Sequence, residues 1–224
     1  MKIGIIGGTG PAGQSVGLRL ASMGHQITIG SRDSDRSTNL VEGLLAKWST
    51  HDLAFTGGSN VDAASCDLVV LATPWEGSVA AALSLSSQLE GKVLVSMVNA
   101  LAKVGDEFQA LVPSRGSIAA SLQGVLPKTM VTTAFQHLPA RELGDLNMPM
   151  QADVMVCSDT AEGAEIVSSV ISSVPGLRPV HCGSLASANA VEALTAVLLN
   201  INIRYKSHVS LQLSGLKEIG GLTA

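Results

Sequence analysis

The amino-acid sequence predicts an α/β fold: a doubly wound, Rossmann-type parallel sheet with a smaller C-terminal α/β lobe that ends in a long helix. Two observations predict it. Short apolar strand segments alternate with helical segments along the chain. A glycine-rich loop also follows the first strand segment directly, as in dinucleotide-binding βαβ units. We place the nucleotide-binding domain at residues 1–147 and the lobe at residues 148–224.

The first βαβ unit occupies the start of the chain. Residues 1–6 read as a buried strand, a glycine loop spans 7–13, a helix runs to Met23, and a second strand covers 26–29. Further strands are expected at 67–72, 93–95 and 131–134, with helices at 36–48, 77–87 and 117–125. Beyond a crossover loop at 146–151, the pattern predicts a strand at 153–157, a helix at 161–174, a strand at 179–182 and a helix at 188–213.

The last helix carries a continuous apolar seam, because apolar residues recur three and four positions apart. The seam consists of Val191, Leu194, Leu198, Ile201 and Tyr205. It can pack on its own domain, or it can form the contact between two copies of the chain. We expect a homodimer if the second reading holds.

The glycines of the first loop fit two nucleotide-binding patterns. Gly8-x-Gly10-x-x-Gly13 is the dinucleotide fingerprint, and the spacing that starts at Gly7 is used by short-chain dehydrogenases. Both place free backbone amides of a helix N-terminus against a pyrophosphate. Short-chain dehydrogenases also need a Tyr with a Lys four positions later, but the sole tyrosine, Tyr205, is followed at that spacing by Val209. That class is therefore excluded.

The end of the second strand indicates which dinucleotide binds. NAD-binding proteins usually carry an Asp or Glu there to hold the ribose 2′-hydroxyl, whereas this chain has Gly30, Ser31 and Arg32, with Arg36 one turn on. A carboxylate would repel a 2′-phosphate, and a hydroxyl with guanidinium groups would bind it. The sequence predicts NADP(H).

A second contact with the nucleotide is expected after the strand at 67–72. Thr73 and Glu76 have the spacing of a capping box, and Pro74 would occupy the first helical position. One interpretation is that these residues do no more than start a helix. Because ligands lie at the carboxyl ends of the strands in such sheets, Trp75 can also border the cofactor.

Composition limits the partners and the compartment. The net charge of −4 and the lack of a basic cluster argue against nucleic acid. No run approaches roughly 18 consecutive apolar residues, so we expect no membrane contact. The cysteines Cys66, Cys157 and Cys182 are odd in number and widely spaced. They predict neither a disulfide framework nor a metal site, and we expect reduced thiols in the cytoplasm.

Several motifs together resemble the NADPH-dependent reductases of coenzyme F420, and the actinobacterial-type members most. They are the glycine loop at 7–13, Gly-Ser-Arg at 30–32, Thr-Pro-Trp-Glu at 73–76, Val-Ser-Met-Val-Asn-Ala at 95–100, Leu-Pro-Ala-Arg-Glu-Leu at 138–143, Pro-Gly-Leu-Arg-Pro at 175–179, and Glu-Ala-Leu-Thr with Leu-Leu-Asn within 192–200. The resemblance covers nearly the whole chain in register, and so it is much more specific than the glycine loop alone.

The resemblance implies reversible hydride transfer between NADPH and the 8-hydroxy-5-deazaflavin of coenzyme F420, as cosubstrate. By that likeness, the residues around the nucleotide are Thr9, Gly10, Pro11, Ala12, Ser31, Arg32, Arg36, Trp75, Val79, Leu101 and Ala140. The residues near the deazaflavin would be Asn99, Gln136, His137, Leu138 and Thr195, with His137 as a hydrogen-bond donor. Gln136 stands where archaeal relatives have a histidine. Arg141, Arg178, Arg204 and Lys206 are candidate contacts for the anionic tail of F420.

Hydride transfer between two bound cofactors needs no catalytic acid or base, because the cofactors carry the chemistry. The sequence agrees, since it offers no Ser-His-Asp set, no Cys-His pair and no metal-binding cluster. Two alternatives stay open. One is an NADP-dependent reductase of another flavin-like or carbonyl acceptor. The other is a non-catalytic NADP(H) sensor that binds partner proteins and needs no second pocket.

Overall fold

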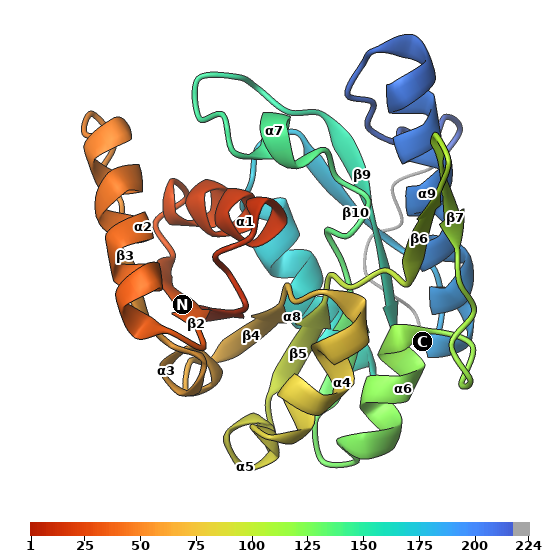
Figure 1. Cartoon of the computed structure of the whole chain (residues 1–224), viewed down its shortest axis with the longest axis horizontal. Coiled ribbons are helices and arrows are strands. Elements are labelled where there is room, and N and C mark those ends of the chain that lie inside the picture. Colours follow the sequence, from red (N-terminus) through yellow and green to blue (C-terminus); the bar gives the residue numbers. More distant parts are fainter. Residues whose placement is uncertain (217–224) are drawn as a thin grey trace.

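The computed structural model describes residues 1–216; residues 217–224, the end of the predicted lobe, lie outside the described part. Helices cover both faces of one eight-stranded sheet, which confirms the predicted fold class (Figure 1). The strand order is β10-β9-β8-β5-β4-β1-β2-β3. The strands are β1 Lys2–Ile6, β2 Gln26–Ser31, β3 Phe55–Ser59, β4 Leu68–Leu71, β5 Val93–Ser96, β8 Met130–Thr133, β9 Ala152–Ser158 and β10 Leu177–His181.

Six strands of this sheet, from β8 to β3 in the strand order, run parallel to their neighbours. β9 pairs antiparallel with β8 and parallel with β10. The segment after residue 147 therefore adds two reversed strands to the same sheet. The division into functional lobes at 147 and 148 remains a proposal.

Two hydrophobic layers lie on the two faces of the sheet. One is covered by α1 Pro11–Ala21, α2 Ser34–Lys47 and α8 Ala161–Ser172, and the other by α3 Asn60–Ala64, α4 Trp75–Leu83, α5 Ser86–Leu89 and α6 Ile118–Val125. Alternating strand residues supply the two layers: Ile5 faces the first and Ile6 the second, and both are fully buried. Burial on both faces explains why these strands are almost entirely apolar.

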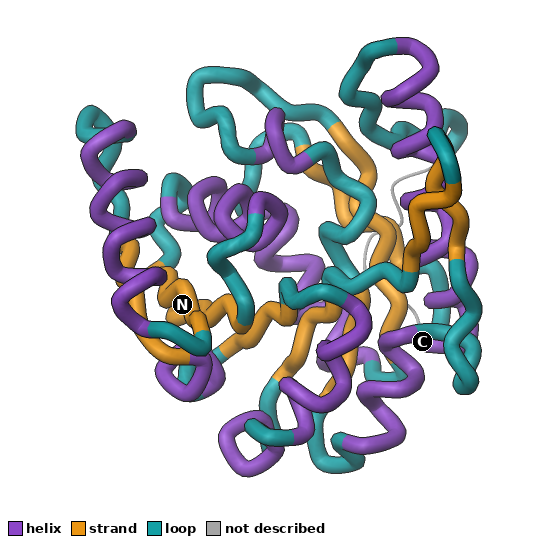
Figure 2. Tube along the Cα trace, viewed as in Figure 1, coloured by secondary structure: helices purple, strands orange, loops and turns teal. Residues whose placement is uncertain are grey.

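A two-stranded hairpin lies along the last helix (Figure 2). It consists of β6 Leu101–Val104 and β7 Glu107–Ala110, and the helix is α9 Ala188–Tyr205, preceded by the single 3-10 turn η1 Leu185–Ser187. The Asn200 side chain joins the two, because its Oδ1 accepts from the Phe108 amide at 2.7 Å and its Nδ2 donates to the Phe108 carbonyl at 2.8 Å.

Leu185–Tyr205 is the one segment among residues 1–216 with the length and mean hydropathy, 1.2, of a membrane-spanning helix. Its polar side chains, however, bond inside the protein. Glu192 accepts from two amides of α6, Thr195 donates to a carbonyl after β8, and Asn200 binds the hairpin. The segment is 33% buried, and we interpret it as a helix that packs on the sheet domain through these bonds.

The predicted end of the last helix, residue 213, is wrong by eight residues, since α9 ends at Tyr205. Lys206 takes a left-handed conformation with φ of 50° and breaks the helix. Asn202 then fixes the turn, because its carbonyl accepts from Ser207 and its side chain accepts from Val209. The apolar periodicity continued past this point and hid the turn.

Candidate functional site

The candidate site lies at the carboxyl ends of the parallel strands, around β1. The chain passes from β1 outward to β2 and β3 and then returns to β4 on the other side of β1, so the winding direction changes between β1 and β4. Ligands of doubly wound sheets bind at this switch point. The glycine loop after β1 and the Thr73 turn after β4 border it directly.

At Gly7 and Gly13 the glycine loop packs too closely for a side chain. Gly7 has a φ of +68°, and a Cβ atom there would lie 2.5 Å from the Thr73 methyl carbon. A Cβ on Gly13 would lie 2.8 Å from the Gly8 Cα. The contact at Gly7 places the loop against the turn after β4. The contact at Gly13 places the first turn of α1 against the loop. The backbone is thereby free to approach a ligand closely.

No side chain caps the N-terminus of α1. Its N-cap is Gly10, whereas Asp33, Ser117 and Thr160 cap α2, α6 and α8 with side-chain oxygens. The first-turn amides of α1 therefore have no side-chain acceptor, which suits a phosphate. The predicted residues Thr9, Gly10, Pro11 and Ala12 all lie at this end of the helix.

The predicted 2′-phosphate residues lie at the end of β2 and the start of α2. Ser31 is buried, and its hydroxyl accepts from the Asp33 amide at 3.2 Å. Arg32 and Arg36 are exposed and form no ion pair within residues 1–216. The nearby Asp33 carboxylate accepts from the first-turn amides of α2 as its N-cap. The two guanidinium groups therefore remain available to an anion.

The predicted capping box at Thr73 is wrong. Pro74 is extended, with ψ of 145°, and becomes the N-cap of α4, so the helix starts one residue later than the box requires. The Thr73 hydroxyl is consequently buried without a partner, and Glu76 is exposed. Trp75 and Val79 lie half-buried in the first turns of α4, at the switch point.

Three predicted deazaflavin residues from distant segments meet at one carbonyl oxygen. The Gln136 carbonyl accepts from Asn99 Nδ2 at 3.1 Å and from the Thr195 hydroxyl at 3.3 Å. Phe135, just before, has a φ of 68°, which is rare for a residue with a side chain and turns the chain at the end of β8. The structure thus brings Asn99, Gln136 and Thr195 together.

Buried polar atoms without partners concentrate in this region. Within residues 1–216 there are eight such side-chain atoms, and five belong to Thr73, Asn99, Gln136 and His137. Both polar atoms of the Gln136 side chain are among them. An unpaired buried polar atom costs about 1–3 kcal/mol, and so a cluster of them requires an explanation. These residues follow β4, β5 and β8 at one edge of the sheet, where a polar ligand would satisfy them.

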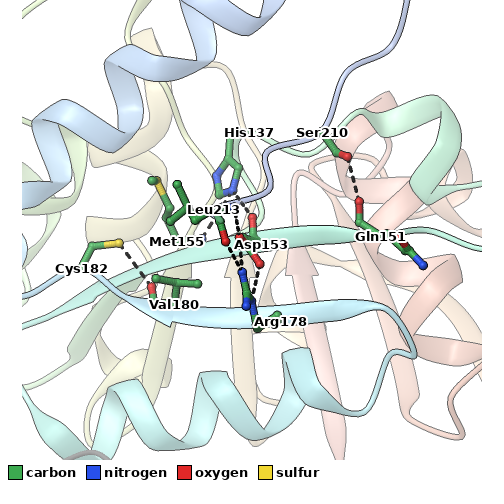
Figure 3. A network of polar contacts seen from close by, with 9 residues as sticks. All are labelled: His137, Gln151, Asp153, Met155, Arg178, Val180, Cys182, Ser210 and Leu213. Carbon is green, nitrogen blue, oxygen red and sulfur yellow. Dashed lines mark hydrogen bonds and ion pairs between the residues drawn. The ribbon is translucent and has the colours of Figure 1, made fainter. Parts of the chain in front are cut away.

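His137 is tied to the backbone of β9 (Figure 3). Its Nε2 lies 3.0 Å from the Asp153 carbonyl and 3.4 Å from the Met155 amide nitrogen. Burial lowers the pKa of the imidazole, which favours the neutral ring. Nε2 either donates to the Asp153 carbonyl or accepts from the Met155 amide, according to the tautomer, and Nδ1 is buried without a partner. The role of His137 as a donor to the deazaflavin stays a prediction.

The structure places three further predicted residues at element starts or in the core. Leu138 is buried, Ala140 begins α7 Ala140–Leu143, and Leu101 begins β6. Two of the candidate tail contacts are already paired. Arg178 binds Asp153 through two hydrogen bonds, and Arg204 pairs with Glu107 at 3.2 Å.

Asn60 is a site residue that the sequence did not reveal. Its side-chain oxygen accepts from the Gly7 amide at 3.1 Å, and so it holds the glycine loop from α3. The only signal in the sequence is Ser59-Asn60-Val61-Asp62, which reads as an ordinary capped helix start. Nothing in that pattern connects it to residue 7.

A hollow of about 450 Å³ lies elsewhere, between α6 and the start of α9. Its lining includes Arg115, Ser117, Asp159 and Asn189, but none of the predicted site residues. No group of three or more potential metal ligands occurs within residues 1–216. The switch point, with its unpaired polar atoms, is therefore the stronger site.

Comparisons with known proteins point the same way. Residues 2–100 match the family model described as NADP oxidoreductase, coenzyme F420-dependent. The chain is 35% identical to the F420-dependent NADP reductase of Methanocaldococcus jannaschii over 212 residues, or 92% of this chain and 95% of that one. It is 32% identical to the enzyme of the same name from Methanothermobacter thermautotrophicus, over 91% of this chain and 90% of that one.

Among solved structures, one from Arthrobacter sp. FB24, provisionally described as an F420-dependent NADP-reductase, superposes with a TM-score of 0.79. It is 24% identical and covers 93% of this chain and 96% of its own. This likeness supports the fold.

Proposed function

Because the chain belongs to the family of coenzyme F420-dependent NADP oxidoreductases, we propose that its switch-point site transfers hydride reversibly between NADPH and the 8-hydroxy-5-deazaflavin of coenzyme F420. When bound, the two cofactors would supply the chemistry themselves: the nicotinamide would give a hydride to the deazaflavin, and the proton that completes its reduction would come from solvent. The protein's contribution is to bind, to orient and to exclude water.

One group of residues would bind NADP(H), and a second group would bind the deazaflavin. The open N-terminus of α1 would hold the pyrophosphate of NADP(H), and Ser31, Arg32 and Arg36 would hold its 2′-phosphate. Trp75, Val79, Leu101 and Ala140 would border the rest of the nucleotide. Asn99, Gln136, His137, Leu138 and Thr195 would surround the deazaflavin.

The chemistry of these residues fits both groups. The carboxamide of nicotinamide and the ring edge of a deazaflavin carry donors and acceptors side by side. The unpartnered atoms of Thr73, Asn99, Gln136 and His137 likewise include both kinds, because the Gln136 amide donates while its oxygen and that of Asn99 accept. The single observation that carries the proposal is this cluster at the edge where the open helix end of α1 also lies.

Two further proposals complete the picture. We propose a homodimer. Of the predicted seam, Val191 and Leu198 are buried within the chain, whereas Tyr205 at its end is exposed and would contact a second copy. Light scattering of the wild type and of Tyr205→Glu would test it, and a wild-type monomer would refute it. We also propose a cytoplasmic location, which agrees with three cysteines that are all free thiols.

An optical assay tests the enzymatic proposal. Purified protein is mixed with NADPH and oxidised coenzyme F420, and the visible absorbance of the deazaflavin is followed. Loss of that absorbance at a rate proportional to protein concentration supports the proposal. Tight NADPH binding without turnover would instead favour the sensor, and turnover with only another flavin-like or carbonyl acceptor would favour the alternative reductase.

A further inference from the structure

Arg19 is a buried arginine whose charge is satisfied by backbone carbonyls. It lies in α1, is only 7% exposed, and forms no ion pair within residues 1–216. Its Nε donates to the Leu143 carbonyl at 2.9 Å. Its Nη2 reaches the carbonyls of Glu142 at 2.9 Å, Asp145 at 2.7 Å and Met148 at 3.3 Å. One side chain thus binds four backbone carbonyls between residues 142 and 148.

Residues 142–148 need contacts with the rest of the protein to keep their conformation. The helix at their start, α7, has four residues, far fewer than an isolated helix needs. Its C-terminal carbonyls have no further turn of helix to bind, and they form the negative end of its dipole. A guanidinium group suits this end because it offers several donors and a positive charge. Arg19 therefore acts as the C-cap of α7 from another helix.

A close contact completes the attachment of α7 to α1, which lie side by side (Figure 1). A Cβ atom on Gly144 would lie 2.7 Å from the Ser15 hydroxyl oxygen, so a larger residue there would require the Ser15 side chain to move. Ser15 lies one turn before Arg19 on α1. Two contacts one turn apart fix both the distance and the rotation of α7.

The two ends of this attachment carry different parts of the site. The N-terminus of α1 is the proposed pyrophosphate site. The residues that lead into α7, from Gln136 to its first residue Ala140, form the proposed wall beside the deazaflavin and the nicotinamide. Leu138 joins them to the β8 turn through its amide, which donates to the Phe135 carbonyl at 3.1 Å. Gln136 and His137 are also bonded to Asn99, Thr195 and the backbone of β9, so the α1–α7 contact is the part of this support that comes from the pyrophosphate side.

We propose that Arg19 is a positioning residue: by fixing α7 to α1 it sets where residues 136–140 stand relative to the bound NADPH, and so the alignment of hydride donor and acceptor. This rests on the proposed function. Hydride transfer depends steeply on alignment, since a displacement of about 1 Å can cost on the order of 100-fold in rate. Arg19 is not among the proposed cofactor-binding residues, and so it should affect turnover much more than NADPH binding.

The test compares Arg19→Met and Arg19→Lys with the wild type. We expect kcat with F420 to fall about tenfold or more in Arg19→Met. The Kd for NADPH, measured by nucleotide fluorescence without F420, should change less than about threefold. Arg19→Lys keeps the charge but loses the fork of donors, and it should fall between the two. If Arg19→Met does not fold, the kcat and the NADPH Kd of Arg19→Lys provide the test instead.

Gln123→Ala is the matched control. Gln123 also binds a loop from a helix, because its amide donates to the Leu126 and Thr129 carbonyls and its oxygen accepts from the Val131 amide. This loop enters β8 at the edge opposite the site. Gln123→Ala should lower the thermal midpoint with kcat unchanged. Equal losses of kcat in both variants at equal loss of stability would reduce Arg19 to a structural residue and overturn the proposal.

Hydrogen–deuterium exchange separates this proposal from the proposed function. In Arg19→Met, peptides that contain residues 136–148 should exchange faster, while the peptide that contains β1 and the glycine loop keeps the wild-type rate. If the wild type does not reduce F420, the proposed function is refuted. The exchange result would still show whether Arg19 fixes the position of residues 136–140. Unchanged exchange in residues 136–148, or unchanged kcat in an active enzyme, would overturn the positioning role.

Discussion

Asn99 donates its side-chain amide to the carbonyl oxygen of Gln136 at 3.1 Å, although the two residues are 37 positions apart. Asn99 follows β5 and Gln136 follows β8, and these strands are neighbours in the sheet. The bond therefore joins two strand ends into one wall. Thr195 donates to the same oxygen from α9, so the wall also includes the last helix.

Removal of both donors should cost more than the sum of the single changes. Asn99→Leu and Thr195→Val each leave the Gln136 carbonyl one partner, and we expect each to lower the free energy of unfolding by about 1 kcal/mol. The double variant leaves that carbonyl without either side-chain donor, which adds roughly 1–2 kcal/mol. Chemical denaturation of the four proteins measures the coupling. Strict additivity would show that the two donors do not share this acceptor.

Arg32→Ala should weaken NADPH binding about 10- to 100-fold, the range of a lost charge-assisted hydrogen bond. NADH, which lacks the 2′-phosphate, should bind as before. Isothermal titration with both nucleotides measures the difference. Arg115→Ala, which removes an exposed arginine far from the switch point, serves as the control. Equal weakening of NADPH and NADH would remove Arg32 from the 2′-phosphate site.

Glu192 should make stability depend on pH. Burial raises the pKa of its carboxyl to about 7, against the pull of the Ile118 and Ala119 amides. The folded state thus holds the proton more tightly than the unfolded chain, so this contribution is fully present below about pH 4.5 and is lost as the pH rises through 7. Between pH 5.5 and 8 the loss should be about 2 kcal/mol.

Glu192→Gln should lack this part of the pH dependence, and denaturation curves at several pH values measure it. Glu165→Gln removes an exposed carboxyl on α8 and should leave the dependence as in the wild type. If Glu192→Gln followed the wild-type curve, the Glu192 carboxyl would not be the titrating group.

Asp153 and Arg178 should contribute stability that is lost in acid. Hydrogen bonds from Arg178 lower the pKa of the Asp153 carboxyl, against the effect of burial. Its contribution is present above the unfolded pKa of about 4 and disappears as the pH falls through the lower folded value. Arg178→Ala should cost about 2 kcal/mol at pH 7, because it leaves a buried carboxylate without its guanidinium partner.

Arg204→Ala is the matched control, since the pair of Arg204 and Glu107 is exposed and should contribute less than about 1 kcal/mol. Thermal unfolding measures both. Leu213 also binds Asp153 through its amide (Figure 3). Limited proteolysis should therefore cut the chain after residue 206 faster in Arg178→Ala. Equal stability of the two arginine variants would contradict the account of Asp153.

Strand and helix patterns predicted most of the sheet because apolar residues mark strands buried on both faces. β3 escaped this rule, since Phe-Thr-Gly-Gly-Ser is rich in glycine. Gly57 is needed where β3 approaches α2, because a Cβ there would lie 2.4 Å from the Thr38 amide nitrogen. The hairpin of β6 and β7 was also missed, because its strands are short and largely exposed and its partner is a helix about 90 residues away.

Some residues of the candidate site could also be predicted from the sequence, and others could not. The glycine loop and Ser31-Arg32 were predictable because local spacing carries their meaning. Asn60 and Arg19 were not, because each acts on backbone from a distant segment, 53 residues away in the case of Asn60 and over 120 in that of Arg19. The capping box at Thr73 failed because Pro74 took the N-cap position.

The most direct test of the central claim follows a labelled hydride. NADPH that carries deuterium on one face of C4, and then on the other, is mixed with the protein and oxidised coenzyme F420. Mass spectrometry of both products then locates the label. We predict that deuterium passes into the reduced deazaflavin from one face only, with none in the solvent, because the site holds the two rings in a fixed orientation. Label left wholly in the nicotinamide, or released into water, would contradict direct hydride transfer.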